Sequence, residues 1–172
     1  MKLGQTPSQT VGPFFAFGLV AEQYGYPNTQ IATCTIAGEG ERISIAGQVF
    51  DGDMEPVGDA LIELWQPGMG FARVGTGMNA EKSFSFGTCK PTARSAAEAP
   101  CIAVILFMRG LLSHLHTRVY FSDEAEANAK DPVLAALPPD RRRTLIAARL
   151  KAGQYRLDIH LQGEHETVFF DL

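Results

Sequence analysis

Alternation of apolar and polar side chains is the dominant pattern from residue 43 onward. Apolar residues or glycine occupy every second position in residues 43–49 and again in residues 155–161. A period of two places alternate side chains on opposite faces of a strand, so both segments predict half-buried strands. Further strands are predicted at residues 60–65, 83–88, 101–108 and 115–121. Several short strands separated by turn signals predict a mainly β protein, an antiparallel β-sandwich with long loops.

Two short helices are predicted between the later strands. Ser122 is a suitable cap for the first helix, and Pro132 ends it. The second helix is predicted over residues 139–150, with a proline in its first turn and Gly153 near its C-terminal cap. Together with the strand pattern, these helices predict a β protein with little helical content.

The N-terminal residues 1–40 show no regular period and predict an irregular arm. The arm carries phenylalanines at positions 14, 15 and 17, rings that need another surface to pack on. No repeat or linker divides the remaining chain, so residues 1–172 predict a single domain. An apolar share of 45% and a charged share of 20% suit such a globular domain.

Charge and cysteine content exclude several classes of partner. The net charge of −4 offers no basic footprint for nucleic acid or an anionic membrane. The apolar runs are much shorter than the ~20 residues that span a bilayer. Cys34, Cys89 and Cys101 form no CxxC pair, and residues 1–10 lack the apolar stretch of a secretory signal. We therefore expect a cytoplasmic protein without a nucleic-acid or membrane partner.

Few side chains suggest chemistry by their spacing. His114 and His116 share one face of a predicted strand and could hold a metal ion, but Arg118 follows on that face. A polar pair at the start of a strand is the simpler interpretation. Cys101, inside an apolar run, is expected to be a small buried residue. Arg109 follows that run directly, so its guanidinium needs water, a carboxylate or a partner chain, of which composition favours water.

Five segments match a known family in order along the chain. They are residues 6–15 (TPSQTVGPFF), 45–67 (IAGQVFDGDMEPVGDALIELWQP), 106–134 (LFMRGLLSHLHTRVYFSDEAEANAKDPVL), 141–150 (RRRTLIAARL) and 155–172 (YRLDIHLQGEHETVFFDL). These segments resemble the alpha chains of intradiol ring-cleaving dioxygenases that act on protocatechuate. The resemblance spans nearly the whole chain and implies a β-sandwich core.

The resemblance also implies a partner and a cofactor. In that family homologous alpha and beta chains pair, and the beta chain holds Fe(III) through two tyrosines and an HxH pair. O2 is inserted into protocatechuate to give 3-carboxy-cis,cis-muconate. Here Cys101 and Ala103 stand at the two histidine positions, and the segments after Gln66 and Pro91 contain no tyrosine. The resemblance therefore implies no metal ligand and no catalytic residue in this chain, with the iron held by the beta chain.

Five residues of this chain match positions that contact substrate in the family. Thr10, Gly12, Pro13 and Phe14 follow its T-x-G-P-aromatic pattern, which lines the partner's substrate cavity. Arg109 matches an arginine that helps to hold the anionic substrate. The resemblance thus implies that this chain supplies walls and positive potential to the site of a larger alpha–beta assembly.

The same residues fit two other interpretations. The chain could be a stand-alone homo-oligomeric binding or scaffold protein with a degenerate fold, its arm packing only on its own sandwich. An independent metalloenzyme using His114 and His116 is a third hypothesis. The segments after Gln66 and Pro91 are shorter than is usual in alpha chains, through either trimmed loops or residues absent from this sequence.

Overall fold

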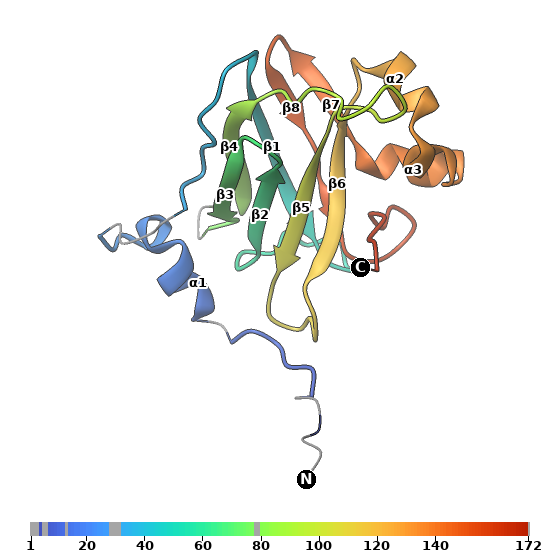
Figure 1. The fold of residues 1–172 in the computed structure, drawn as a ribbon. Helices are drawn as coiled ribbons and strands as arrows, with labels where there is room; N and C mark the ends of the chain where they lie inside the picture. Colours follow the sequence, from blue (N-terminus) through green and yellow to red (C-terminus); the bar gives the residue numbers. More distant parts are fainter. Residues whose placement is uncertain (1–3, 5–6, 13, 28–31, 78–79, 172) are drawn as a thin grey trace.

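The structure, a computed structural model, describes residues 4, 7–12, 14–27, 32–77 and 80–171. Its main element is a sheet of nine strands (Figure 1). These strands are β1 (Arg42–Phe50), β2 (Leu61–Gln66), β3 (Gly70–Gly75), β4 (Ser83–Cys89), β5 (Cys101–Phe107), β6 (Leu115–Phe121), β7 (Ile146–Lys151), β8 (Gln154–Arg156) and β9 (Ile159–His160). The prediction of a mainly β protein is therefore confirmed.

The sheet is mixed, and this corrects the predicted antiparallel sandwich. Its strand order is β3-β2-β5-β6-β7-β8-β1-β4, with β9 also paired to β1. The β6–β7, β1–β8 and β1–β9 pairs are parallel, and the other pairs are antiparallel. A period of two reveals which face a side chain occupies but not the direction of the neighbouring strand, so the alternation could not show this.

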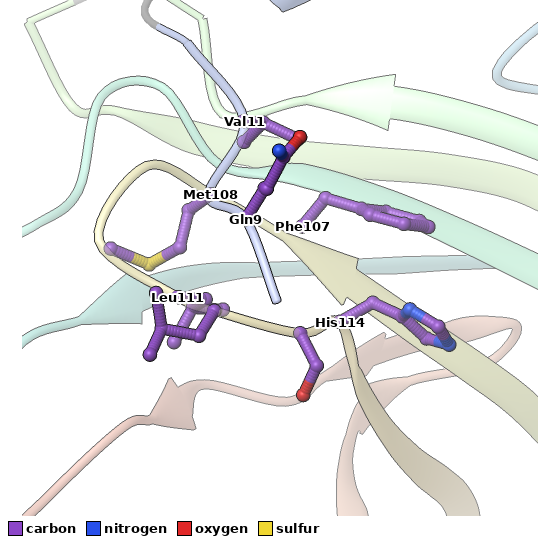
Figure 2. Close-up of a pocket in the computed structure, with 8 residues that line it drawn as sticks. Gln9, Val11, Phe107, Met108, Leu111 and His114 are labelled. Carbon is purple, nitrogen blue, oxygen red and sulfur yellow. The ribbon is translucent and has the colours of Figure 1, made fainter. Parts of the chain in front are cut away.

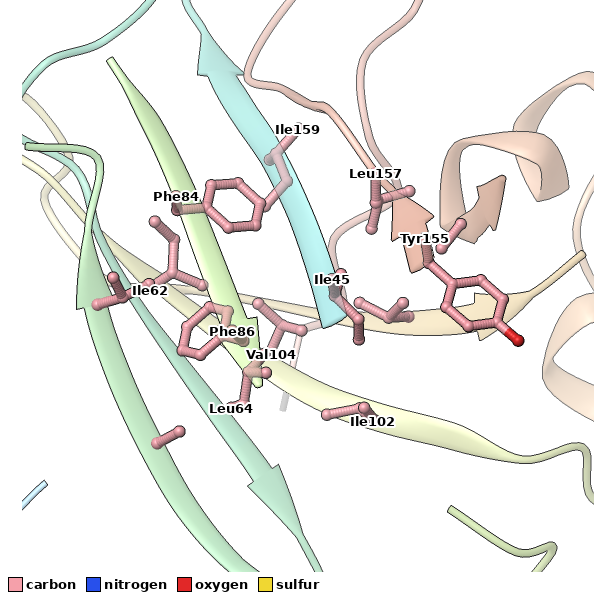
Figure 3. Close-up of a cluster of buried hydrophobic side chains, with 14 of the residues drawn as sticks. Ile45, Ile62, Leu64, Phe84, Phe86, Ile102, Val104, Tyr155, Leu157 and Ile159 are labelled. Carbon is pink, nitrogen blue, oxygen red and sulfur yellow. The ribbon is translucent and has the colours of Figure 1, made fainter. Parts of the chain in front are cut away.

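One continuous path of strands curls around a shared core instead of forming two separate sheets. The strands at the two ends of the path, β3 and β4, lie against each other, so the sheet is nearly closed. Apolar side chains from opposite sides meet inside, with Ile45 and Phe86 facing Ile62 and Val104 (Figure 3). Each of these four side chains is buried, so the core holds the two halves in a fixed relation.

The predicted strand at residues 155–161 is divided in two. β8 ends at Arg156 and β9 begins at Ile159, with Asp158 between them. The Asp158 carboxylate accepts a hydrogen bond from the backbone N–H of Gln48 in β1, at 3.0 Å. A side chain thus replaces a backbone ladder bond at the point where the ladder is interrupted.

The helical segments are short. They are α1 (Phe15–Leu19), η1 (Ala21–Tyr24), α2 (Ala125–Lys130), α3 (Pro132–Ala135), α4 (Pro139–Arg142) and η2 (Arg143–Leu145). Two were predicted, whereas the described residues contain six helical segments. Ser122 does not cap α2, because its hydroxyl accepts from the backbone N–H of Arg149 at 2.9 Å. Within the described residues, none of these helices is long and apolar enough to cross a membrane.

The predicted helix over residues 139–150 is wrong in its second half. Helical structure ends at Leu145, and residues 146–151 form β7. β7 pairs with β6 on one edge and β8 on the other, so it connects the two halves of the sheet. The helix-forming sequence yields to this pairing because tertiary contacts override weak intrinsic propensity.

The N-terminal arm is partly helical and docks on the sheet. Ala16 and Val20 are buried against Leu61 at the start of β2. The Gln23 amide bonds the Gly75 backbone in both directions, accepting at 2.7 Å and donating at 3.0 Å. A Cβ at Gly75 would lie 2.8 Å from the Gln23 Oε1, so a larger residue there would require the Gln23 side chain to shift. The arm is thereby fixed beside the end of β2 where β5 finishes.

Candidate functional site

The two ends of β5 carry the two candidate sites of this chain. The first, here called the Cys101 end, lies where β5 begins, and the second, the Arg109 end, lies just beyond its last residue, Phe107. β5 pairs with β2 and β6 on its two sides, so both ends are held by a central strand of the sheet.

A hollow of about 210 Å³ lies at the Cys101 end, lined by Cys101 and by residues 66–69 and 91–94. The structure therefore brings together the three segments that the resemblance matched to iron-ligand positions. The connection from β2 to β3 comprises only residues 67–69, so it turns tightly at the rim of the hollow. The hollow forms because the segments at residues 66–69 and 91–94 meet the start of β5 at one edge of the sheet.

The side chains around this hollow do not fit a ferric ion. The Gln66 amide is used inside the fold, donating to the Cys89 carbonyl at 3.0 Å and accepting from the Thr88 hydroxyl. Burial raises the pKa of the Cys101 thiol above its ordinary value of 9.0, so it is protonated near neutral pH. Ferric iron needs hard anionic donors, and these residues supply none. Across the residues that the structure describes, no group of three His, Cys, Asp or Glu side chains is arranged to hold a metal.

A buried carboxylate stabilises the backbone behind this hollow. Asp131 is 1% exposed and caps α3 by accepting from the N–H groups of Val133 and Leu134 at 2.9 and 3.0 Å. It also accepts from the N–H of Ala99 at 2.9 Å and from the Tyr120 hydroxyl at 3.3 Å. Burial raises the pKa of Tyr120 to about 12, so the phenol remains a donor. This network fixes the chain just before Cys101.

The Arg109 end contains an ion pair that the strand register explains. Leu61 of β2 lies opposite Phe107 of β5, and continuing this register places Asp59 opposite Arg109. The Arg109 Nε lies 2.6 Å from the Asp59 Oδ2. Of the three partners expected for this guanidinium, a carboxylate is therefore present, whereas composition favoured water. The Arg109 side chain remains 62% exposed, so most of it faces outward.

The arm meets Arg109 at the turn that follows β5. The Thr10 hydroxyl accepts a hydrogen bond from the backbone N–H of Gly110 at 2.8 Å. Gly110 has φ +92°, which sharply redirects the chain and favours glycine. Thr10 and Arg109, which lie far apart in sequence, are thus brought to one turn.

The other arm residues singled out from the sequence lie beyond this contact. The Gly12 carbonyl accepts from the Phe15 N–H at 3.2 Å. Phe14 is 74% exposed, and its ring stacks on Phe17 with centroids 5.7 Å apart. Pro13 lies outside the residues that the structure describes. The arm therefore packs partly on its own sheet but presents the Phe14 ring outward.

A second hollow, of about 270 Å³, separates the arm from the β5–β6 turn (Figure 2). Its walls are mostly apolar and come from Gln9, Val11, Phe107, Met108, Leu111, Leu112, Ser113 and His114. Sequence reasoning did not identify this hollow or Asp59. The available signals were the apolar residues on both sides of Arg109 and an acid directly before a strand.

The two histidines of the HLH segment lie beside this hollow. The rings of His114 and His116 contact edge to face with centroids 4.7 Å apart. His114 lies in the wall of the hollow and also packs on Phe107, with centroids 5.4 Å apart. The pair is therefore integrated into the packing at the start of β6.

Solved structures with similar folds define the class of protein. The chain is similar to the dioxygenase domain of a dioxygenase carbohydrate-binding protein fusion from Streptomyces sp. SirexAA-E, with a TM-score of 0.57, 20% identity, and coverage of 96% of this chain and 100% of that one. It is similar to an intradiol ring-cleavage dioxygenase from Tetranychus urticae, with a TM-score of 0.57, 14% identity, and coverage of 92% and 94%. The fold is that of the intradiol dioxygenases.

Sequence relatives then narrow this class to one family. A scan against models of protein families gave no match. The protocatechuate 3,4-dioxygenase alpha chain of Burkholderia cepacia is 48% identical over 194 aligned positions, covering 99% of this chain and 98% of that one. The corresponding alpha chain of Pseudomonas putida is 40% identical, covering 98% and 97%. This chain belongs to the protocatechuate 3,4-dioxygenase alpha-chain family.

The alignment also shows a difference in length. It extends over 194 positions for a chain of 172 residues, so the Burkholderia relative has residues that this chain lacks.

Proposed function

We propose that this chain is the alpha subunit of a protocatechuate 3,4-dioxygenase, with residues 1–172 forming one domain. The identity of 48% with a known alpha chain along almost the full length of both proteins carries the proposal. A homologous beta chain holds the Fe(III), since the donors at the Cys101 end do not suit it. The assembly inserts both atoms of O2 into protocatechuate and yields 3-carboxy-cis,cis-muconate.

This chain contributes walls and positive charge to the substrate cavity of the beta chain. Thr10, Gly12, Pro13 and Phe14 form the wall, with the exposed Phe14 ring as an apolar surface for an aromatic substrate. The exposed part of the Arg109 guanidinium binds the substrate carboxylate. The contact between the Thr10 hydroxyl and Gly110 supports the assignment of arm and arginine to one site.

Co-expression with the homologous beta chain tests the function directly. The complex is expected to contain iron and to consume O2 with protocatechuate. A chain that remains a homo-oligomer in the presence of the beta chain, with no activity in the mixture, would support the scaffold interpretation instead.

Substitution of Arg109 tests the proposed site within that complex. A charge-assisted hydrogen bond contributes roughly 1.5–3 kcal/mol, so Arg109→Ala should raise the KM for protocatechuate about tenfold or more while iron content stays unchanged. Arg109→Lys should restore only part of the affinity, because lysine keeps the charge without the planar fork. Catechol, which lacks the carboxylate, should be little affected. Equal damage to both substrates would show that Arg109 is structural.

A further inference from the structure

Asp59 occupies a place fixed by the ladder between β2 and β5. It precedes β2, and the register of that pair extends to set Asp59 across from Arg109. Its carboxylate Oδ2 lies 2.6 Å from the Arg109 Nε. The contact joins the segment before β2 to the segment after β5. Because the pairing of these two buried strands sets the backbone on both sides, the position of Asp59 is fixed.

The two partners differ strongly in exposure. The Asp59 side chain is 16% exposed, and its buried Oδ2 has no hydrogen-bond partner among the described residues, so its contact with Arg109 is an ion pair. The Arg109 side chain is 62% exposed. Burial raises the pKa of Tyr24 in the arm, and the nearby charge of Asp59 raises it further. The acid therefore lies inside the junction of arm and sheet, while the guanidinium extends outward from it.

The nitrogen that Asp59 engages determines which part of the guanidinium is left for a ligand. Arginine has five N–H donors, one on Nε and four on Nη1 and Nη2, and the ion pair with Asp59 is made at the Nε side. The Nη1 and Nη2 nitrogens form one edge of the planar fork, which can bind a carboxylate through two parallel hydrogen bonds. The backbone of the next residue, Gly110, is held by Thr10, so the base of the arginine is fixed as well.

We infer that Asp59 is a positioning residue, which holds the Nε side of Arg109 so that the Nη1–Nη2 edge faces the substrate carboxylate. This inference rests on the proposed function of Arg109. It extends that proposal by assigning specificity for a carboxylate-bearing ring to an acid–arginine pair rather than to a lone cation.

A purely electrostatic role for Asp59 predicts an effect of the opposite sign. An acid beside the arginine lowers the local positive potential, so its removal would strengthen binding of an anion. If Asp59 positions the fork instead, its removal weakens binding, because the flexible arginine must then be ordered when substrate binds.

The experiment uses the co-assembled alpha–beta complex and steady-state kinetics with protocatechuate and with catechol. Asp59→Ala should raise the KM for protocatechuate about three- to tenfold with little change in kcat, the size expected for the loss of one ion pair that orders the guanidinium. Asp59→Asn should have a smaller effect and Asp59→Glu should retain most of the affinity. The KM for catechol should not change, and Asp53→Asn, an exposed acid in the same connection, should change neither KM.

A double variant completes the test. Adding Asp59→Ala to Arg109→Ala should cause no further rise in the KM for protocatechuate, since Asp59 acts through Arg109. A fall or no change in this KM after Asp59→Ala, beside a selective effect of Arg109→Ala, would overturn the positioning role alone. An Arg109→Ala variant that harms both substrates equally would overturn the proposed role of Arg109 and the inference with it.

Discussion

The two ends of β5 differ in what their side chains offer to a ligand. At the Cys101 end the Gln66 amide is satisfied inside the fold by Thr88 and Cys89, and the exposed Arg94 pairs with Glu98. At the Arg109 end the guanidinium and the Phe14 ring extend outward. A strand of seven residues separates the ends by about 20 Å. The Cys101 end can therefore lack metal-ligand donors while the Arg109 end keeps side chains that could contact a ligand, because the two ends share no residues beyond the core strand.

Metal content tests the difference between the two ends of β5 most directly. The chain purified without a beta chain should contain no stoichiometric iron and show no tyrosinate-to-iron absorption. Placing histidine at both positions, Cys101→His with Ala103→His, should not change this, because the phenolate donors are still absent. Elemental analysis and a visible spectrum check both proteins. About one iron per chain with a charge-transfer band would show that the Cys101 end is a working metal site.

Removing the carboxylate behind the Cys101 end should have the next largest effect. Asp131→Ala leaves two buried backbone N–H groups, those of Ala99 and Leu134, and the part-buried N–H of Val133 without their acceptor. Each buried unsatisfied donor costs about 1–3 kcal/mol, so the free energy of unfolding should fall by about 2 kcal/mol or more. Urea denaturation measures this change.

Two further variants make the result specific to Asp131. Asp131→Asn keeps an acceptor and should lose less stability, and Asp140→Ala, an exposed acid in α4, should change the free energy of unfolding by less than about 1 kcal/mol. Equal losses for Asp131→Ala and Asp140→Ala would show that the buried network does not stabilise this end.

Acid should weaken the Cys101 end through Asp123. Although burial alone raises the pKa of Asp123, the hydrogen bonds from Lys90 and Tyr155 outweigh it and lower this pKa below its ordinary value of 3.8. The folded state then binds its proton less readily than the unfolded state. The stabilisation is therefore complete above about pH 4 and is lost as pH falls through the folded pKa.

The Asp123→Asn variant isolates this contribution. The difference in free energy of unfolding between the natural chain and the variant should shrink as pH falls below 3.8. Chemical denaturation at a series of pH values measures the difference. A difference that stays constant across this range would show that the ion pairs of Asp123 with Lys90 and Arg149 contribute no pH-dependent stability.

The smallest effect is expected from the link between arm and turn. Thr10→Val removes the acceptor for the Gly110 N–H but keeps the shape of the side chain. Because the site is exposed and water can replace the hydroxyl, the KM for protocatechuate should rise only about two- to fivefold. Thr10→Ser, which retains the acceptor, is the matched control. Equal kinetics for the Val and Ser variants would show that the hydrogen bond between Thr10 and Gly110 does not affect substrate binding at the Arg109 end.

Sequence reasoning identified local features of the fold but missed those that depend on distant pairing. The strands β5 and β6 were expected almost at their observed bounds, since Cys101 and Phe121 mark clear changes in pattern. β3 was missed because residues 70–75 begin at a glycine. The pairing of β3 with β2, which places Arg73 opposite Glu63, is evident only in the structure.

The candidate site shows the same division. Thr10 and Arg109 were singled out from a resemblance, and the structure adds that both meet at Gly110. Asp59 could not be found in advance, because its role depends on a register between β2 and β5 that no local pattern encodes. The assignment of Gly12, Pro13, Phe14 and Arg109 to a substrate cavity stays a prediction that the kinetic experiments test.

The parallel pairing of β1 with β8 and β9 has a consequence for how the chain is made. β1 ends at Phe50, and its partners on that edge begin only at Gln154, after residues 51–153. Such a high contact order makes folding slow, because a long loop must close before the contact forms. During translation β4 is synthesised soon after β1 and can pair with one edge of it. The other edge of β1 stays unpaired until β8 and β9 are made. That open edge makes the nascent chain prone to aggregation until synthesis is nearly complete.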